Sequence, residues 1–243
     1  IANPSFGETQ ASSEKINSRG KKRPSLTATR NLSDTYFAPL GGTAQEARSI
    51  QALFPEATFL TGAQATETAL KQTVAPQILH IATHGFFLED KDESNAAARI
   101  ENPLLRAGLA FTGANRRKGE KDDGILTALE ASGLNLWGTK LVVLSACDTG
   151  LGEVRNGEGV YGLRRAFVLA GTESLVMSLW SVSDYVTREL MTGYYKNLKQ
   201  GAGRGAALRQ IQLEMLKKPA RRHPFYWASF IQSGEWAELQ VQK

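Results

Sequence analysis

Two short, mostly apolar runs constrain the fold of this chain more than any other feature. Residues 77–84 and residues 140–146 are each rich in Ile, Leu or Val and are each short enough to be a single strand. A strand with apolar residues at successive positions, and not only at alternate ones, is buried on both faces, as in a parallel sheet covered by helices. Helical patterns alternate with the other strand patterns, so the sequence predicts an α/β fold with a mostly parallel central sheet.

The expected elements follow from periodicity and from turn residues. We expect helices over residues 43–53, 63–74, 126–134, 160–169, 183–199 and 204–217, and strands over residues 57–60, 77–84, 108–111, 140–146, 174–180 and 225–231. Thr43 followed by Glu46 is the pattern of a capping box at the start of the first helix.

The domain organisation is expected to be simple. No internal repeat and no second core is evident, so residues 1–243 are expected to form one domain, with the polar, basic residues 9–35 as a flexible insertion. The chain starts without Met and without a signal pattern, and residues 1–8 look like the end of a strand. We therefore expect further domains upstream.

Composition excludes several classes of protein. The chain is 42% apolar and 22% charged, and no run approaches the ~18 apolar residues of a membrane span, so we expect no membrane segment. The net charge is +5, but the basic segment within residues 15–30 has no aromatic residues among its charges, so we expect no direct nucleic-acid binding. The single cysteine rules out an internal disulfide.

A thiol and an imidazole stand at the ends of the two apolar runs. Cys147 follows the second run, and His84, followed by Gly85, closes the first. Side chains just past the carboxyl ends of neighbouring parallel strands converge on one crevice. A cysteine nucleophile needs a base, and an imidazole is the usual one, so the pattern predicts a Cys147–His84 dyad. A lone cysteine is also commonly a small buried apolar residue.

Other chemistries fit the sequence less well. Residues 152–158 have the glycine spacing of a phosphate-binding loop but carry Glu158 where that loop needs Lys. Residues 157–162 match a dinucleotide glycine pattern, yet they lie about ten residues beyond their strand. His80 and His84 have a zinc-like spacing but lie on a strand, so we expect no metal and no cofactor. His80 is expected to be a hydrogen-bonded core residue, and His223 a surface residue.

Residues 78–87 and 144–152 resemble the two signature segments of CHAT domains, and the likeness extends over about residues 36–236. CHAT domains are caspase-like domains that usually follow tetratricopeptide repeats (TPR) in bacteria. The resemblance implies a three-layer α/β/α caspase–hemoglobinase fold and a cytoplasmic cysteine endopeptidase that cleaves protein or peptide substrates. It implies that Cys147 is the nucleophile, that His84 is the general base, and that the N–H groups of Gly85 and Cys147 hold the oxyanion. An upstream TPR or sensor region would regulate the activity.

The resemblance leaves specificity and activation open. Asp184 and Asp148 are the candidates for an acidic substrate pocket that accepts Arg or Lys, and Asp184 is equally suited to be a helix N-cap. The basic residues 116–118 could be a site of self-cleavage or simply part of a solvated loop. The alternative to an enzyme is a catalytically silent CHAT-like interaction or scaffold module. A degenerate module of that kind should lack the His or the Cys, whereas this chain has both.

Overall fold

The computed structural model describes residues 1–7, 32, 35–88, 102–117, 122–148, 158–180 and 182–239. The helices are α1 (Gly41–Leu53), α2 (Glu67–Lys71), α3 (Ala128–Ala131), α4 (Glu158–Leu169), α5 (Asp184–Lys199), α6 (Arg204–Lys217) and α7 (Pro224–Trp227), with 3-10 turns η4 (Pro103–Leu105) and η5 (Pro219–Arg221). The strands are β1 (Ala2–Pro4), β2 (Thr61–Gly62), β3 (Ile78–Ile81), β4 (His84–Phe87), β5 (Ala107–Ala110), β6 (Ile125–Thr127), β7 (Leu141–Leu144), β8 (Cys147–Asp148), β9 (Ser174–Ser178) and β10 (Phe230–Gly234).

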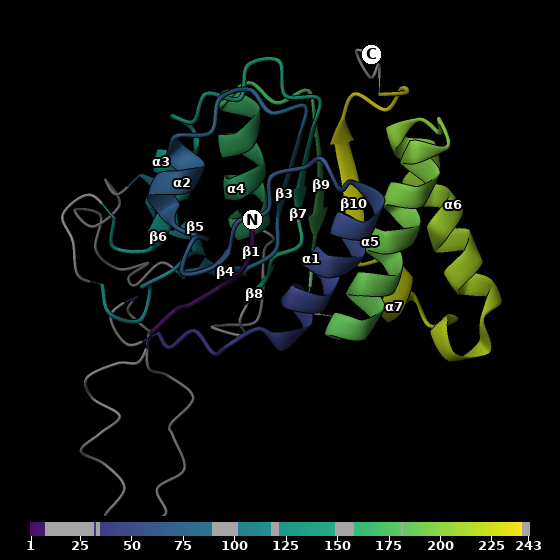
Figure 1. The fold of residues 1–243 in the computed structure, drawn as a ribbon, viewed down its shortest axis with the longest axis horizontal. Helices are drawn as coiled ribbons and strands as arrows, with labels where there is room; N and C mark the ends of the chain where they lie inside the picture. Colours follow the sequence, from purple (N-terminus) through teal and green to yellow (C-terminus); the bar gives the residue numbers. More distant parts are fainter. Residues whose placement is uncertain are drawn as a thin grey trace, which may run out of the picture.

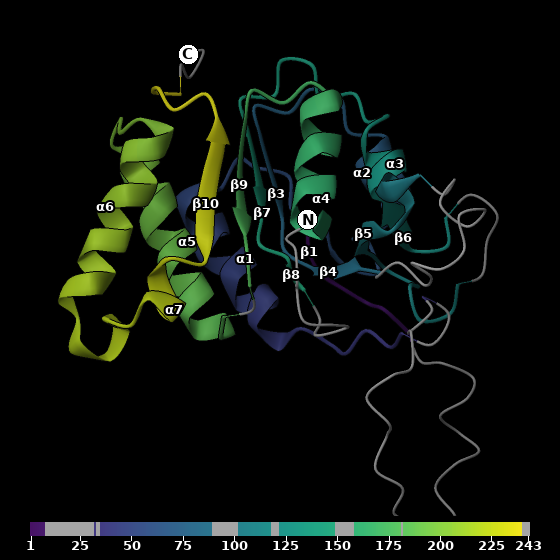
Figure 2. The ribbon, with the colours of Figure 1, turned by 180° about the vertical axis from the view of Figure 1, so that it is seen from behind.

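A four-stranded main sheet forms the centre of the molecule, in the order β10-β9-β7-β3. Strands β3, β7 and β9 are parallel, and β10 is antiparallel to β9. Helix α4 covers one face, and helices α1 and α5 cover the other, with α6 beside α5 (Figures 1 and 2). Every residue of β7 and β9 is buried between these layers. The predicted three-layer α/β/α arrangement and the parallel central strands are confirmed.

A second four-stranded sheet, in the order β6-β5-β4-β8, continues from the main sheet. Strand β4 follows β3 after residues 82–83, which we call the first crossing, and β8 follows β7 after residues 145–146, the second crossing. The prediction of one strand over residues 77–84 is therefore wrong at the first crossing. There Ala82 pairs with Ala2, and the hydroxyl of Thr83 donates to the backbone oxygen of Ala110, so the chain changes sheets.

Several predicted elements differ from the observed ones. No strand forms over residues 57–60; the short β2 follows them instead and pairs with β1. The helix expected over residues 63–74 is only the five-residue α2, and residues 126–134 divide between β6 and α3. In residues 225–231, helix α7 precedes the last strand, β10. Because these segments are short, their conformation depends on strand partners that are distant in sequence.

The predicted capping box at α1 is also wrong. Helix α1 begins two residues earlier, after Leu40, and the Thr43 hydroxyl donates to the backbone oxygen of Leu40 instead of accepting from an N–H. Glu46 is consequently not a capping residue. It points into the interior, with only 2% of its surface exposed. The insertion expected over residues 9–35 lies outside the described residues, except for Leu32 and Thr35.

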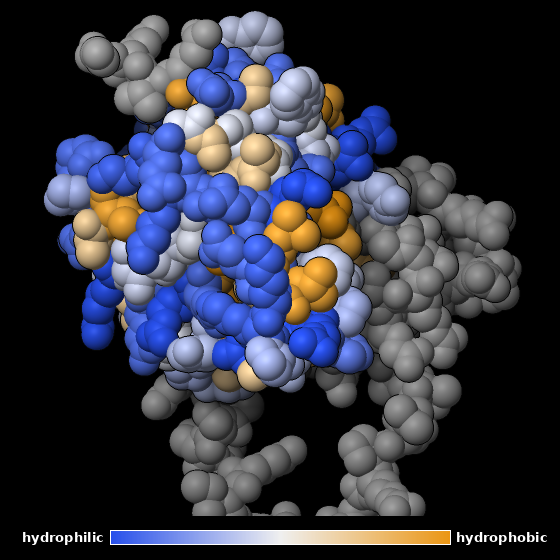
Figure 3. All heavy atoms as spheres, turned by 90° about the vertical axis from the view of Figure 1, so that its right-hand side faces the viewer, coloured by the Kyte–Doolittle hydropathy of each residue, from blue (hydrophilic) through white to orange (hydrophobic). Residues whose placement is uncertain are grey.

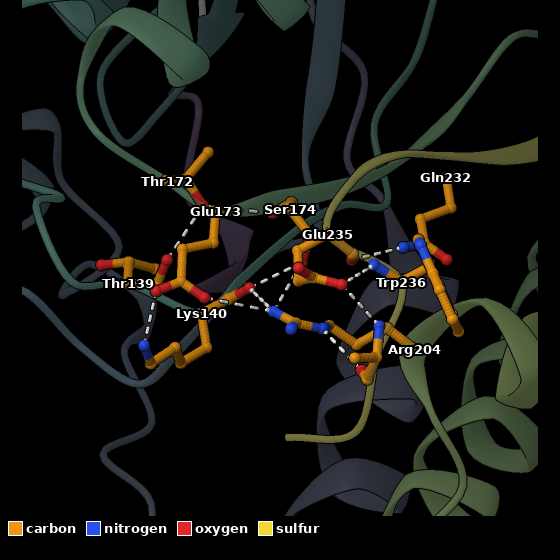
Figure 4. Close-up of polar contacts among 10 residues, drawn as sticks. Thr139, Lys140, Thr172, Glu173, Ser174, Arg204, Gln232, Glu235 and Trp236 are labelled. Carbon is orange, nitrogen blue, oxygen red and sulfur yellow. Dashed lines mark hydrogen bonds and ion pairs between the residues drawn. The ribbon is translucent and has the colours of Figure 1, made fainter. Parts of the chain in front are cut away.

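Arg204 anchors α6 to the end of the main sheet that lies away from β8 (Figure 1), and Figure 4 shows its side chain beside Lys140 and Glu173. Its side chain is buried, and its Nη1 and Nε atoms donate to the backbone oxygens of Lys140 and Ala237 over 2.7 and 3.0 Å. Nη1 also lies 3.6 Å from the carboxylate of Glu173. The guanidinium thus joins three chain segments that are far apart in sequence, and all its bonds lie at the amino end of β7.

The side of the molecule that α6 forms is largely hydrophilic, with hydrophobic residues in a few small, separate areas (Figure 3). Leu213 and Leu216 are the large exposed apolar residues of α6, at 38% and 37%. Within the described part of the chain, no helix combines the length and the apolar character needed to cross a bilayer.

Candidate functional site

His84 is the first residue of β4, directly after the first crossing. Its Nε2 atom lies 2.7 Å from the backbone oxygen of Ala38. A carbonyl oxygen can only accept a hydrogen bond, so Nε2 carries the proton, and Nδ1 of the neutral ring has the free lone pair. The rings of Phe6 and Phe37 pack beside the imidazole, with centroids 5.1 and 5.8 Å away. The ring is therefore held in one tautomer and one orientation.

Burial and charge act in opposite directions on the pKa of His84. Burial, the largest effect, lowers the pKa, whereas the hydrogen bond to Ala38 and the negative charge of Asp184 raise it. The net result is a pKa below the ordinary value of 6.5. The imidazole is consequently neutral near pH 7, which is the protonation state that a general base requires.

Cys147 is the first residue of β8, and its backbone is directly opposite that of His84. The two strands are parallel, and Gly85 is paired with Asp148 in the same register. Neighbouring strands lie about 4.8 Å apart, so the backbones of the two predicted dyad residues are adjacent. The side chains of Cys147 and Asp148 lie outside the described part of the structure, and so does the suggested pocket role of Asp148.

The equal spacing of the two crossings explains this register. Ile81 pairs with Leu144 at the end of the main sheet, and His84 pairs with Cys147 in the second sheet. Each crossing contains two residues, so the pairing is kept in the second sheet. Gly85, the expected oxyanion residue, is buried inside β4 and also faces Leu109 of β5.

Asp184 lies in the first turn of α5, and the N-cap of that helix is Ser183. The suggestion that Asp184 is the N-cap is therefore wrong. Its carboxylate instead accepts the backbone N–H of Gly42 in α1 over 3.0 Å, and its charge acts on His84. A side chain at Gly42 would collide with it, because a Cβ there would be 2.0 Å from the Cβ of Asp184. The carboxylate is exposed and stands between the starts of α1 and α5.

Asn115 holds the segment that contacts His84. Asn115 directly precedes the basic residues 116–118, yet only 7% of it is exposed. Its Oδ1 accepts the N–H of Phe37 over 2.8 Å, and its Nδ2 donates to the oxygens of Phe37 and Gly7 over 2.9 and 2.8 Å. The amide thus holds both chain segments whose phenylalanines, Phe6 and Phe37, flank the imidazole. An Asn ahead of a basic run gave no local signal of this role.

The remaining histidines lie where they were expected. His80 is hydrogen-bonded in the interior, with Nδ1 2.9 Å from the hydroxyl of Tyr195. His223 is exposed and caps α7. The described residues contain no group of three or more His, Cys, Asp or Glu side chains suited to hold a metal ion. The suggested self-cleavage site at residues 116–118 is described only as far as Arg117.

Comparison with known proteins adds a family and two relatives. A family model described as CHAT domain matches residues 1–235. Tetratricopeptide repeat protein 28 of Homo sapiens is 32% identical over 115 residues, and its Mus musculus counterpart is 31% identical over 115 residues. Each alignment covers 47% of this chain and 5% of the relative. The chain therefore corresponds to a small part of these relatives, and both relatives are mammalian, so the bacterial origin stays a prediction.

Proposed function

Because this chain belongs to the CHAT domain family, which is a family of caspase-like peptidases, we propose that it is a cysteine endopeptidase with a His84–Cys147 dyad. The observation that carries this proposal is the register of β4 and β8, in which the two residues are opposite each other. The hydrogen bond from Nε2 of His84 to Ala38 supports it, because it leaves Nδ1 free to accept a proton.

The chemistry follows from these two residues. Nδ1 of His84 accepts the thiol proton of Cys147, and the thiolate attacks the scissile carbonyl carbon. The backbone N–H groups of Gly85 and Cys147 stabilise the oxyanion of the tetrahedral intermediate. Nδ1–H then donates its proton to the leaving amine, which gives a thioester. Water attacks the thioester while Nδ1 takes its proton, and the thiol is restored as the acid product leaves.

Asp184 contributes to this cycle through its charge. The imidazole becomes positive twice in the cycle, and a carboxylate near it favours that state. The same carboxylate could also receive a basic residue of the substrate, so we extend the proposal to a preference for Arg or Lys before the cleaved bond, with Asp148 as the second acidic candidate. A protein or peptide is the substrate class that fits this chemistry.

Regulation by an upstream helical region is the second part of the proposal. The two relatives are named as tetratricopeptide repeat proteins, and most of their length lies outside the alignment with this chain. We propose that such repeats accompany this domain and control it. A reducing compartment such as the cytoplasm would suit a nucleophile that must remain a free thiol.

Labelling of the only cysteine by an electrophilic peptide that carries Arg or Lys at its reactive end tests the proposal. We expect Cys147 to be labelled at least tenfold faster in the wild-type protein than in His84→Ala. An otherwise identical peptide that ends in Asp is the matched probe, and it should react more slowly. Equal, slow labelling of both proteins would contradict the dyad and would favour a catalytically silent interaction module.

A further inference from the structure

A buried polar cluster that the proposed chemistry does not use lies between α1 and the main sheet. The carboxylate of Glu46 accepts the hydroxyl of Ser145 at Oε2 over 3.1 Å, and its Oε1 lies 3.2 Å from Nε2 of His80. His80 in turn contacts the hydroxyl of Tyr195. Within the described part of the chain, neither Oε1 of Glu46 nor Nε2 of His80 makes a hydrogen bond. Their 3.2 Å contact is therefore the polar contact that the structure provides for both atoms.

The position of Ser145 connects this cluster to the nucleophile. Ser145 is the first residue of the second crossing, and Cys147 opens β8 two residues later. Its backbone N–H donates to Ile81 of β3 over 2.9 Å, and its buried hydroxyl bonds to Glu46. The chain is therefore held from two directions at the point where it leaves the main sheet. Only Ala146 separates this anchor from Cys147.

The first crossing is anchored in the same way, but by a different partner. The buried hydroxyl of Thr83, directly before His84, donates to the backbone oxygen of Ala110. Each half of the dyad thus follows a buried hydroxyl that is bonded to another element. For Cys147 this element is α1, and the segment just before α1 contains Ala38, the partner of His84.

We propose that Glu46 is a positioning residue for the nucleophile, and that its carboxylate, held against His80, fixes through Ser145 the crossing that brings Cys147 opposite His84. This inference rests on the proposed function. A small displacement of a reacting group can cost ~100-fold in rate, so an anchor two residues away is close enough to matter.

Two variants remove the anchor, and two others control for it. Ser145→Ala removes the hydroxyl, and Glu46→Ala removes the carboxylate. Glu46→Gln is the conservative variant, because its amide oxygen can still accept from Ser145. Glu67→Ala is the matched control: Glu67 is as buried as Glu46, at 1%, but its partner is Lys71 on α2. Cys147 is the only thiol of the chain, so the rate of its alkylation by iodoacetamide can be followed over pH in every variant by peptide mass spectrometry.

We expect Ser145→Ala and Glu46→Ala to slow alkylation at pH 7 about tenfold and to move the midpoint of its pH profile towards that of His84→Ala, near an ordinary thiol pKa of about 8.5. Glu46→Gln should restore most of the rate. Glu67→Ala should lower the melting temperature without moving the midpoint. If both anchor variants keep the wild-type profile while His84→Ala shifts it, the positioning role is refuted and the dyad stands.

If His84→Ala also keeps the wild-type profile, the dyad itself fails, and amide hydrogen exchange of residues 141–148 decides the role of Glu46. Faster exchange there in Ser145→Ala than in Glu67→Ala would support the anchor, and equal exchange would refute it. If Glu46→Ala does not fold, both the alkylation profile and the hydrogen exchange are measured on Ser145→Ala alone.

Discussion

At the scale of single residues, the environment of His84 sets when the imidazole can act. Its pKa in the folded protein is lower than in the unfolded chain, so the unfolded chain binds its proton more readily. The stability that comes from keeping His84 neutral is fully present above the pKa that His84 has in the unfolded chain. It decreases as the pH falls from about 6.5 through the lowered folded pKa.

The charge of Asp184 opposes this shift, and its removal should be measurable. Asp184→Asn keeps an acceptor for the N–H of Gly42 but removes the negative charge. We expect the pKa of His84 to decrease further in this variant. NMR titration of the three histidines in a Cys147→Ala background measures this without interference from the thiol, and His223→Gln assists the assignment. An unchanged or higher pKa would show that Asp184 does not act on His84.

Asn115 is the second residue-scale test. Asn115→Ala removes three hydrogen bonds at a buried position and leaves the N–H of Phe37 without its acceptor. We expect a loss of roughly 1–3 kcal/mol in the free energy of unfolding, measured in urea. Because Phe37 and Ala38 would loosen, the Nε2–H of His84 should also exchange faster with solvent. A loss of stability with an unchanged exchange rate of the Nε2–H would show that Asn115 does not support the environment of His84.

At the scale of elements, the junction of α1 with α5 depends on a glycine. A Cβ at Gly42 would overlap the side chain of Asp184, whereas a Cβ at Gly41 would meet nothing within 4 Å. Gly42→Ala should therefore destabilise the protein by about 1–3 kcal/mol, as overpacking does. Gly41→Ala, one residue away in the same helix, should be neutral or stabilising by up to about 1 kcal/mol. Urea unfolding of the pair checks this, and equal effects would mean that the two helices can move apart freely.

For the molecule as a whole, a change at one end of the main sheet should alter stability without altering the reactivity of Cys147 at the other end. Arg204→Met removes the donors to Lys140 and Ala237 at the end away from β8 (Figure 4). We expect a loss of about 2–4 kcal/mol in stability, because two hydrogen bonds to a charged group are lost. The alkylation profile of Cys147 should remain that of the wild type. Arg209→Met, at an exposed position of α6, is the control. A shifted profile in Arg204→Met would show that the two ends are coupled.

Local sequence patterns were sufficient to predict the class of fold and the residues of the proposed dyad. Continuous apolar runs identify β3, β7 and β9, and 3.6-residue periodicity identifies α4, α5 and α6, whose observed bounds lie within two residues of those predicted. These signals are local, because an element buried on one face or on both faces has its apolar residues at a characteristic spacing within a few neighbouring positions. His84 and Cys147 could be read in the same way, as polar residues at the ends of such runs.

Which polar groups contact one another, in contrast, is visible in the folded structure and not in the sequence. Glu46 and Ser145 are 99 residues apart in sequence, and Asn115 and Phe37 are 78 apart. The carbonyl of Ala38 belongs to the backbone and carries no side-chain signature at all. A buried polar group needs a partner, but its own residue type does not say where in the chain that partner lies. The change of sheet at the two crossings had the same cause, since it depends on contacts with β1, β5 and α1 that no local pattern records.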